Sequence, residues 1–263
     1  MVGITLSCGY AGCHHPEKRD GWCLYHLLRK DPEEINGFIS YVGQQIEKQA
    51  SGVIDFEGFV FPAGYKFPDR ILTKSVNFIK ALFEGDVTFE KMHFQGGAIF
   101  NEAKFHGRCV MRNSTFGVLG STDHISAFDN VEFEELSFEN IDFNEYVQFS
   151  GAIFNGGVTL DHTRFHQNAN FQATTFSGTA GFLNVVFQRD AWFSPFNSRK
   201  TSFAKYVTFA QTGFVGLGLF DDVTFSSDSN FDQAFFVRKP KWFLRRAIYQ
   251  WVMRVQFTDI SEK

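Results

Sequence analysis

The sequence predicts an all-β solenoid: a right-handed, quadrilateral parallel β-helix that occupies residues 51–236. Two observations carry this prediction. Phenylalanine supplies 35 of the 263 residues, against 4 Trp and 7 Tyr, and large apolar side chains recur at spacings that alternate between five and six residues. One side-chain shape reused at a fixed short period is typical of a repeat architecture.

The alternation runs through most of the chain and is interrupted twice, at residues 117–127 and 194–202. A helix would need apolar partners at i+3, i+4 and i+7, which this spacing does not supply. Blocks this short also leave no room for strands of ordinary length joined by reversals. The first unbroken series of large positions is Phe56, Phe61, Phe67, Leu72, Phe78, Phe83, Phe89, Phe94, Phe100, Phe105, Met111 and Phe116.

The residue two positions before each large one gives an independent test of the pattern. Nearly all of these residues are small or β-branched and none is charged, as at Ala98, Ala152 and Val158. Positions two apart point to the same side of an extended chain, so each block is predicted to be a short strand with one large and one small side chain facing inward. Four blocks make a coil of about 22 residues, which gives room for roughly eight coils stacked about 4.8 Å apart.

Three stretches carry a resemblance to a known family: AIFNEAKFHGR at residues 98–108, VQFSGAIFNGG at 147–157 and ANFQATTFSGT at 169–179. They resemble pentapeptide repeats, whose usual pattern is A(D/N)LXX with a central Leu or Phe. The chain departs from that pattern by using Phe almost throughout and by adding a sixth residue to every second block, as in the Phe-rich branch with 11-residue double repeats. The resemblance implies the solenoid fold. It specifies function poorly, because the understood members include gyrase-protecting DNA mimics while most members have no assigned role.

Both ends of the solenoid are predicted to carry capping helices, because open strand edges would otherwise template aggregation. Residues 31–50 form the N-terminal capping helix, with Asp31 as N-cap and Pro32 in the first turn. Residues 237–263 form a basic C-terminal capping helix, with seven basic and two acidic side chains. A basic amphipathic helix that contains Trp can also lie on an anionic membrane surface, which we keep as a less favoured alternative.

Residues 1–30 are predicted to form a Cys/His zinc knuckle. Four ligands fall within a short stretch, and three thiolates with one imidazole are a known structural set for Zn²⁺. His14 or His15 can replace one of these ligands, and reduced buried cysteines are the alternative interpretation. Cys109 stands at a small inward position and is interpreted as a core residue. The predicted metal ligands are Cys8, Cys13, Cys23 and His26.

An acidic patch is predicted on the outer surface. The chain has no Lys or Arg between Arg112 and Arg164. With Phe inside, the acidic residues of this stretch are expected to face solvent, either as a solvated face that maintains solubility or as a handle for a basic partner. The predicted partner-binding residues are Asp129, Glu132, Glu134, Glu135, Glu139, Asp142 and Glu145.

These features together predict a non-enzymatic scaffold that presents a rigid solenoid and its acidic patch to a basic protein partner. We find no catalytic motif and expect no small-molecule substrate and no cofactor besides structural Zn²⁺. One alternative is a DNA mimic that inhibits or protects a DNA-handling enzyme such as a type II topoisomerase; another is a membrane-surface module. Direct nucleic-acid binding is not expected, because residues 1–50 hold five basic and six acidic side chains. The chain begins without a secretory signal pattern and has no long apolar run, which predicts a cytoplasmic protein.

Overall fold

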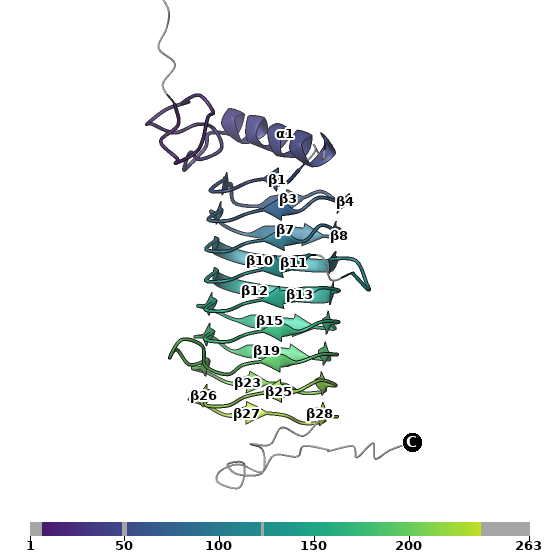
Figure 1. The fold of residues 1–263 in the computed structure, drawn as a ribbon. Helices are drawn as coiled ribbons and strands as arrows, with labels where there is room; N and C mark the ends of the chain where they lie inside the picture. Colours follow the sequence, from purple (N-terminus) through teal and green to yellow (C-terminus); the bar gives the residue numbers. More distant parts are fainter. Residues whose placement is uncertain (1–6, 49–51, 122–123, 238–263) are drawn as a thin grey trace, which may run out of the picture.

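The computed structural model describes residues 7–48, 52–121 and 124–237, and it contains a parallel β-solenoid of about eight turns. The coils stack into a rod, and helix α1 (Pro32–Lys48) and the knuckle lie at its N-terminal end (Figure 1). Every strand pairing within the solenoid is parallel, as between Val60 and Leu82 one coil apart. The fold class predicted from the sequence is confirmed.

Four columns of strands form the four sides of the rod. The first is an eight-stranded sheet made of β1 (Ile54–Asp55), β5 (Val76–Asn77), β9 (Ala98–Ile99), β11 (Ile125–Ala127), β13 (Tyr146–Gln148), β17 (Ala169–Asn170), β21 (Ala191–Trp192) and β25 (Gly218–Leu219). The second contains β2 (Val60–Phe61), β6 (Leu82–Phe83), β14 (Ile153–Phe154), β18 (Thr175–Phe176), β22 (Ser202–Phe203) and β26 (Thr224–Phe225). The third contains β3 (Tyr65–Phe67), β7 (Val87–Glu90), β15 (Val158–Asp161), β19 (Ala180–Leu183), β23 (Val207–Thr208) and β27 (Ser229–Asn230). The fourth contains β4 (Arg70–Leu72), β8 (Met92–Phe94), β16 (Arg164–Phe165), β20 (Val186–Phe187), β24 (Gly213–Phe214) and β28 (Phe235–Phe236). The long strands β10 (Lys104–Phe116) and β12 (Glu132–Phe143) complete the last three columns in the middle of the rod.

The core is a set of stacked phenylalanine rings. In the first column, from Phe78 to Phe220, successive rings lie 4.6 to 4.9 Å apart with interplanar angles of 10° or less. These separations match the spacing of neighbouring strands, so strand pairing and ring stacking impose the same register. The third column is less regular, because Met111 and Leu160 interrupt its rings and both are buried.

At some corners, two successive coils approach each other too closely for a side chain. A Cβ atom on Gly178 would lie 2.0 Å from the carbonyl oxygen of Gly156 in the preceding coil. Only glycine fits at this position without displacing the backbone, so the close approach of these two coils depends on it.

The two interruptions of the period contain loops on the outside of the rod, at residues 117–121 and 194–201, whereas Ile125–Ala127 form strand β11 of the first column. Each loop increases the number of residues between two successive rings of a stack. The affected pairs, Phe100 and Phe128 at the first loop and Phe176 and Phe203 at the second, still stack on each other. Both loops project beyond the coils in Figure 1. The insertions are therefore accommodated at corners, where they do not disturb the core.

Helix α1 covers the N-terminal end of the rod. A reciprocal pair of hydrogen bonds starts it: the Glu34 N–H donates to Asp31 Oδ1 and the Asp31 N–H donates to Glu34 Oε2, each at 2.9 Å. Phe38, Val42 and Ile46 are buried against the first coil, whereas Ile39 is 45% exposed.

The C-terminal capping helix predicted for residues 237–263 lies outside the described residues, apart from Val237. Within the described ranges, no helix is both long and apolar enough to cross a bilayer. The cytoplasmic localisation stays a prediction.

Replacing Phe171 by Ala should lower the free energy of unfolding by about 3–5 kcal/mol, because it removes a buried ring from the first column and leaves a cavity. Phe196→Ala is the matched control. Its ring is 49% exposed in the second loop, so its effect should stay within about 0.5 kcal/mol. Chemical denaturation of both variants measures the difference, and equal midpoints would contradict a core role for Phe171.

Candidate metal centre

The knuckle is a compact pair of turns held by backbone hydrogen bonds. The Cys8 N–H donates to the His15 carbonyl at 3.2 Å, and the Gly9 N–H donates to the Gly21 carbonyl at 2.7 Å. Gly12 and Gly21 have φ angles of +82°, which residues with a side chain adopt only at a cost. The glycines therefore allow the chain to reverse sharply beside its cysteines.

These turns bring the four predicted ligands together. The ligand atoms of Cys8, Cys13, Cys23 and His26 all lie within 4.8 Å of one another. Cys13 Sγ is 3.8 Å from Cys23 Sγ, and His26 Nδ1 is 3.4 Å from Cys8 Sγ and 3.2 Å from Cys23 Sγ. A tetrahedron with Zn–S bonds of about 2.3 Å and a Zn–N bond of about 2.0 Å has edges of roughly 3.5–3.8 Å, so the spacing fits one such ion.

The imidazole of His26 is oriented for metal binding through Nδ1. Its Nε2 lies 3.1 Å from the main-chain carbonyl oxygen of Glu57, which can only accept a hydrogen bond, so we assign the ring proton to Nε2. Nδ1 then presents its lone pair to the thiols. The Tyr10 ring stacks on one face of the His26 ring, with centroids 4.2 Å apart and an interplanar angle of 7°. A metal-binding histidine held by a carbonyl on its second nitrogen is a common arrangement.

The electrostatics of the thiols also favour a cation. Burial raises the pKa of Cys23 to about 12, so that its thiolate is disfavoured without a positive partner. Burial acts in the same direction at Cys8, but hydrogen bonds from the N–H groups of Cys23 and Tyr10 and from the thiols of Cys23 and Cys13 together outweigh it and hold the pKa of the Cys8 thiol below its ordinary value. The Cys23 N–H lies 3.3 Å from Cys8 Sγ. This cluster can therefore bind a metal ion, and Zn²⁺ is the ion that its donor set favours.

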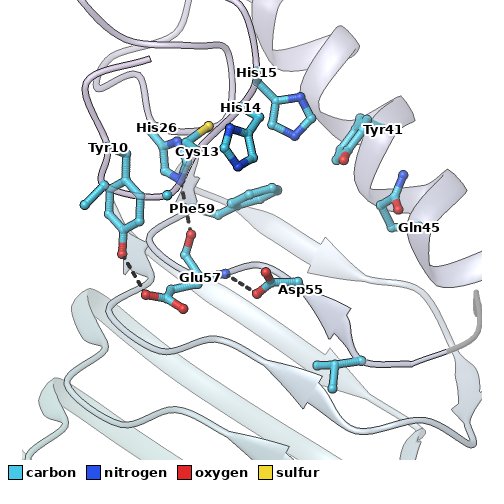
Figure 2. A pocket seen from close by; sticks show the side chains of 13 residues that line it. Tyr10, Cys13, His14, His15, His26, Tyr41, Gln45, Asp55, Glu57 and Phe59 are labelled. Atoms are coloured by element: carbon cyan, nitrogen blue, oxygen red, sulfur yellow. Dashed lines mark hydrogen bonds between the residues drawn. The ribbon is translucent and has the colours of Figure 1, made fainter. Parts of the chain in front are cut away.

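The alternative ligands His14 and His15 are not part of this cluster. Both line a surface hollow beside it, together with Tyr10, Tyr41 and Phe59 (Figure 2). The sequence pattern did not identify Tyr10 or Glu57 as neighbours of the metal site. The Glu57 carbonyl could not be found that way, because it comes from the first coil of the solenoid.

The prediction of a one-sign acidic patch is wrong. Because β10 and β12 pair in register, each of three acidic residues faces a basic residue of the preceding coil. The ion pairs are Lys104–Glu132 at 3.0 Å, Arg108–Glu135 at 3.0 Å and Arg112–Glu139 at 2.7 Å.

The remaining residues of the predicted patch have different environments. Asp142 lies 3.8 Å from Arg164 and 3.3 Å from His166. Asp129 is half-buried, and burial raises its pKa. Glu134 is exposed and takes part in no ion pair among the described residues.

Glu145 corrects the prediction most strongly, because it is buried and does not face solvent. Its carboxyl group lies beneath the first loop, where the Ser126 hydroxyl donates to Oε1 at 2.5 Å and Oε2 has no hydrogen-bond partner in the described part of the chain. Burial raises the pKa of Glu145 to about 7. Its neighbours Gly97 and Gly117 have positive φ angles and leave room for it.

The comparisons with known proteins bear on the coils and not on the knuckle. A family model described as pentapeptide repeats (9 copies) matches residues 78–120 and 149–194. The chain matches no curated protein and no solved structure.

Purified protein should contain about one equivalent of zinc, and Cys13→Ser should lose it, because the substitution removes one of four ligands. Cys109→Ala is the matched control: this thiol is fully buried in the solenoid core, so the variant should keep its zinc. Elemental analysis of the three proteins decides the point. Zinc retained by Cys13→Ser at the wild-type level would contradict this ligand set.

The buried carboxyl of Glu145 should make stability depend on pH. Unfolded chains ionise this group near its ordinary value of 4.5, whereas the folded protein keeps the proton up to about pH 7. The wild type should therefore lose stability as the pH rises from about 4.5 to about 7, and Glu145→Gln should be more stable than the wild type by about 1–3 kcal/mol at pH 8. Denaturation midpoints between pH 5 and 8 test this, with Glu134→Gln expected to follow the wild type. Parallel curves for the wild type and Glu145→Gln would disprove it.

Proposed function

We propose that this pentapeptide-repeat protein is a non-enzymatic interaction scaffold that presents the surface of its solenoid to a protein partner. The matched repeats confirm the family predicted from the sequence. Proteins with these repeats are typically interaction scaffolds, and solenoids in general offer extended rigid surfaces for binding.

The observation that carries the proposal is the fixed register of the outward side chains. Each ring stack holds one coil directly over the next, so an outward residue has its equivalent one coil away, as Arg164 has in Asp142 and Val186. A partner therefore meets straight rows of side chains on a surface that needs no ordering when it binds. Such preorganisation lowers the entropic cost of association.

The three ion pairs between β10 and β12 run around the corner from the second column to the third, and we call this surface the charge ladder (Lys104, Arg108 and Arg112 beside Glu132, Glu135 and Glu139). It presents a positive row beside a negative row, so charge complementarity here would select a partner with a matching pair of rows. That these acidic residues bind a partner stays a prediction.

The ladder weighs against the DNA-mimic alternative. A mimic of DNA needs uncompensated negative charge along its length, whereas three carboxylates of this face are paired with Lys or Arg. The membrane alternative rests on the basic segment 237–263, of which only Val237 lies within the described residues. Both alternatives stay open to experiment.

A double substitution tests whether a partner reads the charge ladder. Arg112→Glu combined with Glu139→Arg keeps the ion pair and exchanges the two charges between the rows. Immobilised wild-type protein should capture a partner from lysate in a way that excess free protein competes, and the exchanged variant should capture at least about tenfold less of it.

Two controls make the outcome specific. Asp228→Lys changes an exposed charge in the last coils and should leave capture unchanged, while equal melting temperatures show that each variant is folded. Failure to capture any competable partner would contradict the scaffold proposal, and inhibition of gyrase supercoiling by the wild type would favour the DNA mimic instead.

A further inference from the structure

A surface hollow of about 400 Å³ lies where the knuckle, helix α1 and the first coil meet. Figure 2 shows Asp55 and Glu57 of the first coil below the Phe59 ring, with His14 and His15 of the knuckle above it. Tyr10 and Tyr41 stand at its sides. Its volume lies within the range of about 300–1,000 Å³ typical of ligand pockets.

Within the part of the chain that the structure describes, the hollow carries negative charge without a positive counterpart. Its described lining includes Asp55 and Glu57 and no Lys or Arg. No ion pair in the described part of the chain involves either carboxylate. The knuckle adds no positive charge in either state, because neutral thiols carry none and Zn²⁺ with three thiolates has a net negative charge.

Neutral donors hold the two carboxylates in place. Asp55 Oδ1 accepts hydrogen bonds from the Glu57 N–H at 3.1 Å and from Asn77 Nδ2 at 2.9 Å. The Tyr10 hydroxyl donates to Glu57 Oε1 at 3.4 Å. These bonds fix the positions of the carboxylates and leave their charge uncompensated, so the geometry is prepared for a cation.

The walls of the hollow are aromatic. Tyr10 and Tyr41 line the hollow and are partly exposed, whereas the Phe59 ring between them is only 5% exposed and packs against Tyr25, with centroids 5.1 Å apart. A cation beside aromatic faces gains attraction from the ring quadrupoles, and a guanidinium group can stack on a ring while it binds a carboxylate through two N–H groups.

We propose that this hollow binds an arginine side chain presented by a partner protein, an inference that rests on the proposed scaffold function. A guanidinium group suits both features of the hollow, its two carboxylates and the aromatic rings that line it. It enters from the open side, where Asp55 and His14 are exposed.

The metal centre and the hollow are adjacent: the ligands Cys13 and His26 also line the hollow, and Tyr10 and Glu57 contact His26. Tyr10 stacks on the ring of His26 and donates to the Glu57 carboxylate, and the Glu57 carbonyl lies at hydrogen-bond distance from His26 Nε2. Metal binding to His26 therefore helps to position one wall and one carboxylate of the hollow. Removal of the metal is expected to weaken arginine binding.

The test is a titration of the full, zinc-loaded chain with the tripeptide acetyl-Gly-Arg-Gly-amide. Binding is measured from the changes in backbone amide chemical shifts in ¹H–¹⁵N spectra. Saturable shifts should be confined to the segments that line the hollow, at residues 10–15, 26, 41–45 and 53–59. The same peptide with citrulline in place of arginine is neutral and nearly isosteric, so it should bind at least about tenfold more weakly.

Two variants locate the site. Asp55→Asn should weaken binding of the arginine peptide by about tenfold or more, because it removes one charge while its Oδ1 still accepts the Glu57 N–H. Glu134→Gln removes an exposed carboxylate from the middle of the rod and should leave binding unchanged. Unaltered amide shifts in the distant coils show that both variants are folded.

Three results would overturn the inference: equal binding of the citrulline peptide, shifts outside the hollow, or Asp55→Asn binding like the wild type. Methylguanidinium binding as tightly as the tripeptide would also overturn it, because the ligand would then be a free small cation. The titration needs no natural partner. If the tripeptide binds but no partner is captured from lysate, the scaffold proposal alone is contradicted. If a partner is captured but the tripeptide does not bind, the arginine site alone is contradicted.

Discussion

Ring stacking between successive coils is the interaction on which the rest of this structure depends. The rings of Phe149, Phe171 and Phe193 lie 4.9 Å apart and nearly parallel, at the separation that parallel strand pairing requires. Because stacking and pairing demand the same spacing, each coil is aligned on its neighbour without help from distant parts of the chain. The outward surface inherits this alignment, so its charges and hydroxyl groups stand in rows.

Much of the fold could be predicted because its rule is local. Each block places one large and one small side chain inward, and the rule survives substitutions such as Leu72, Met111 and Leu160, which are all buried. The cluster of Cys8, Cys13, Cys23 and His26 was also predictable, because these residues are close in sequence and their types suit one metal ion. The N-terminal helix was indicated by Asp31 and Pro32, and in the structure Asp31 and Glu34 form its cap.

The sequence could not predict contacts that depend on the register across an insertion. The first loop shifts the alignment of β12 on β10, and only that alignment places Arg112 beside Glu139. Counting charges along the chain therefore produced a patch of one sign where the folded surface has paired rows. Glu145 was misplaced for a related reason, because it is covered by the same loop. The hollow beside the metal centre needs three separate elements to meet, and no local pattern indicates such a meeting.

Distances along one column test the register most directly. Nitroxide labels on Lys66→Cys and Thr159→Cys lie on the third column, as does a label on Asn230→Cys, three pairings beyond Thr159. With the first label at Lys66, double electron–electron resonance should show the mean distance rising by about 14 Å when the second label moves from Thr159 to Asn230, since each pairing adds about 4.8 Å. An increase that does not correspond to three strand spacings, or a distribution with no defined maximum, would contradict stacking in register.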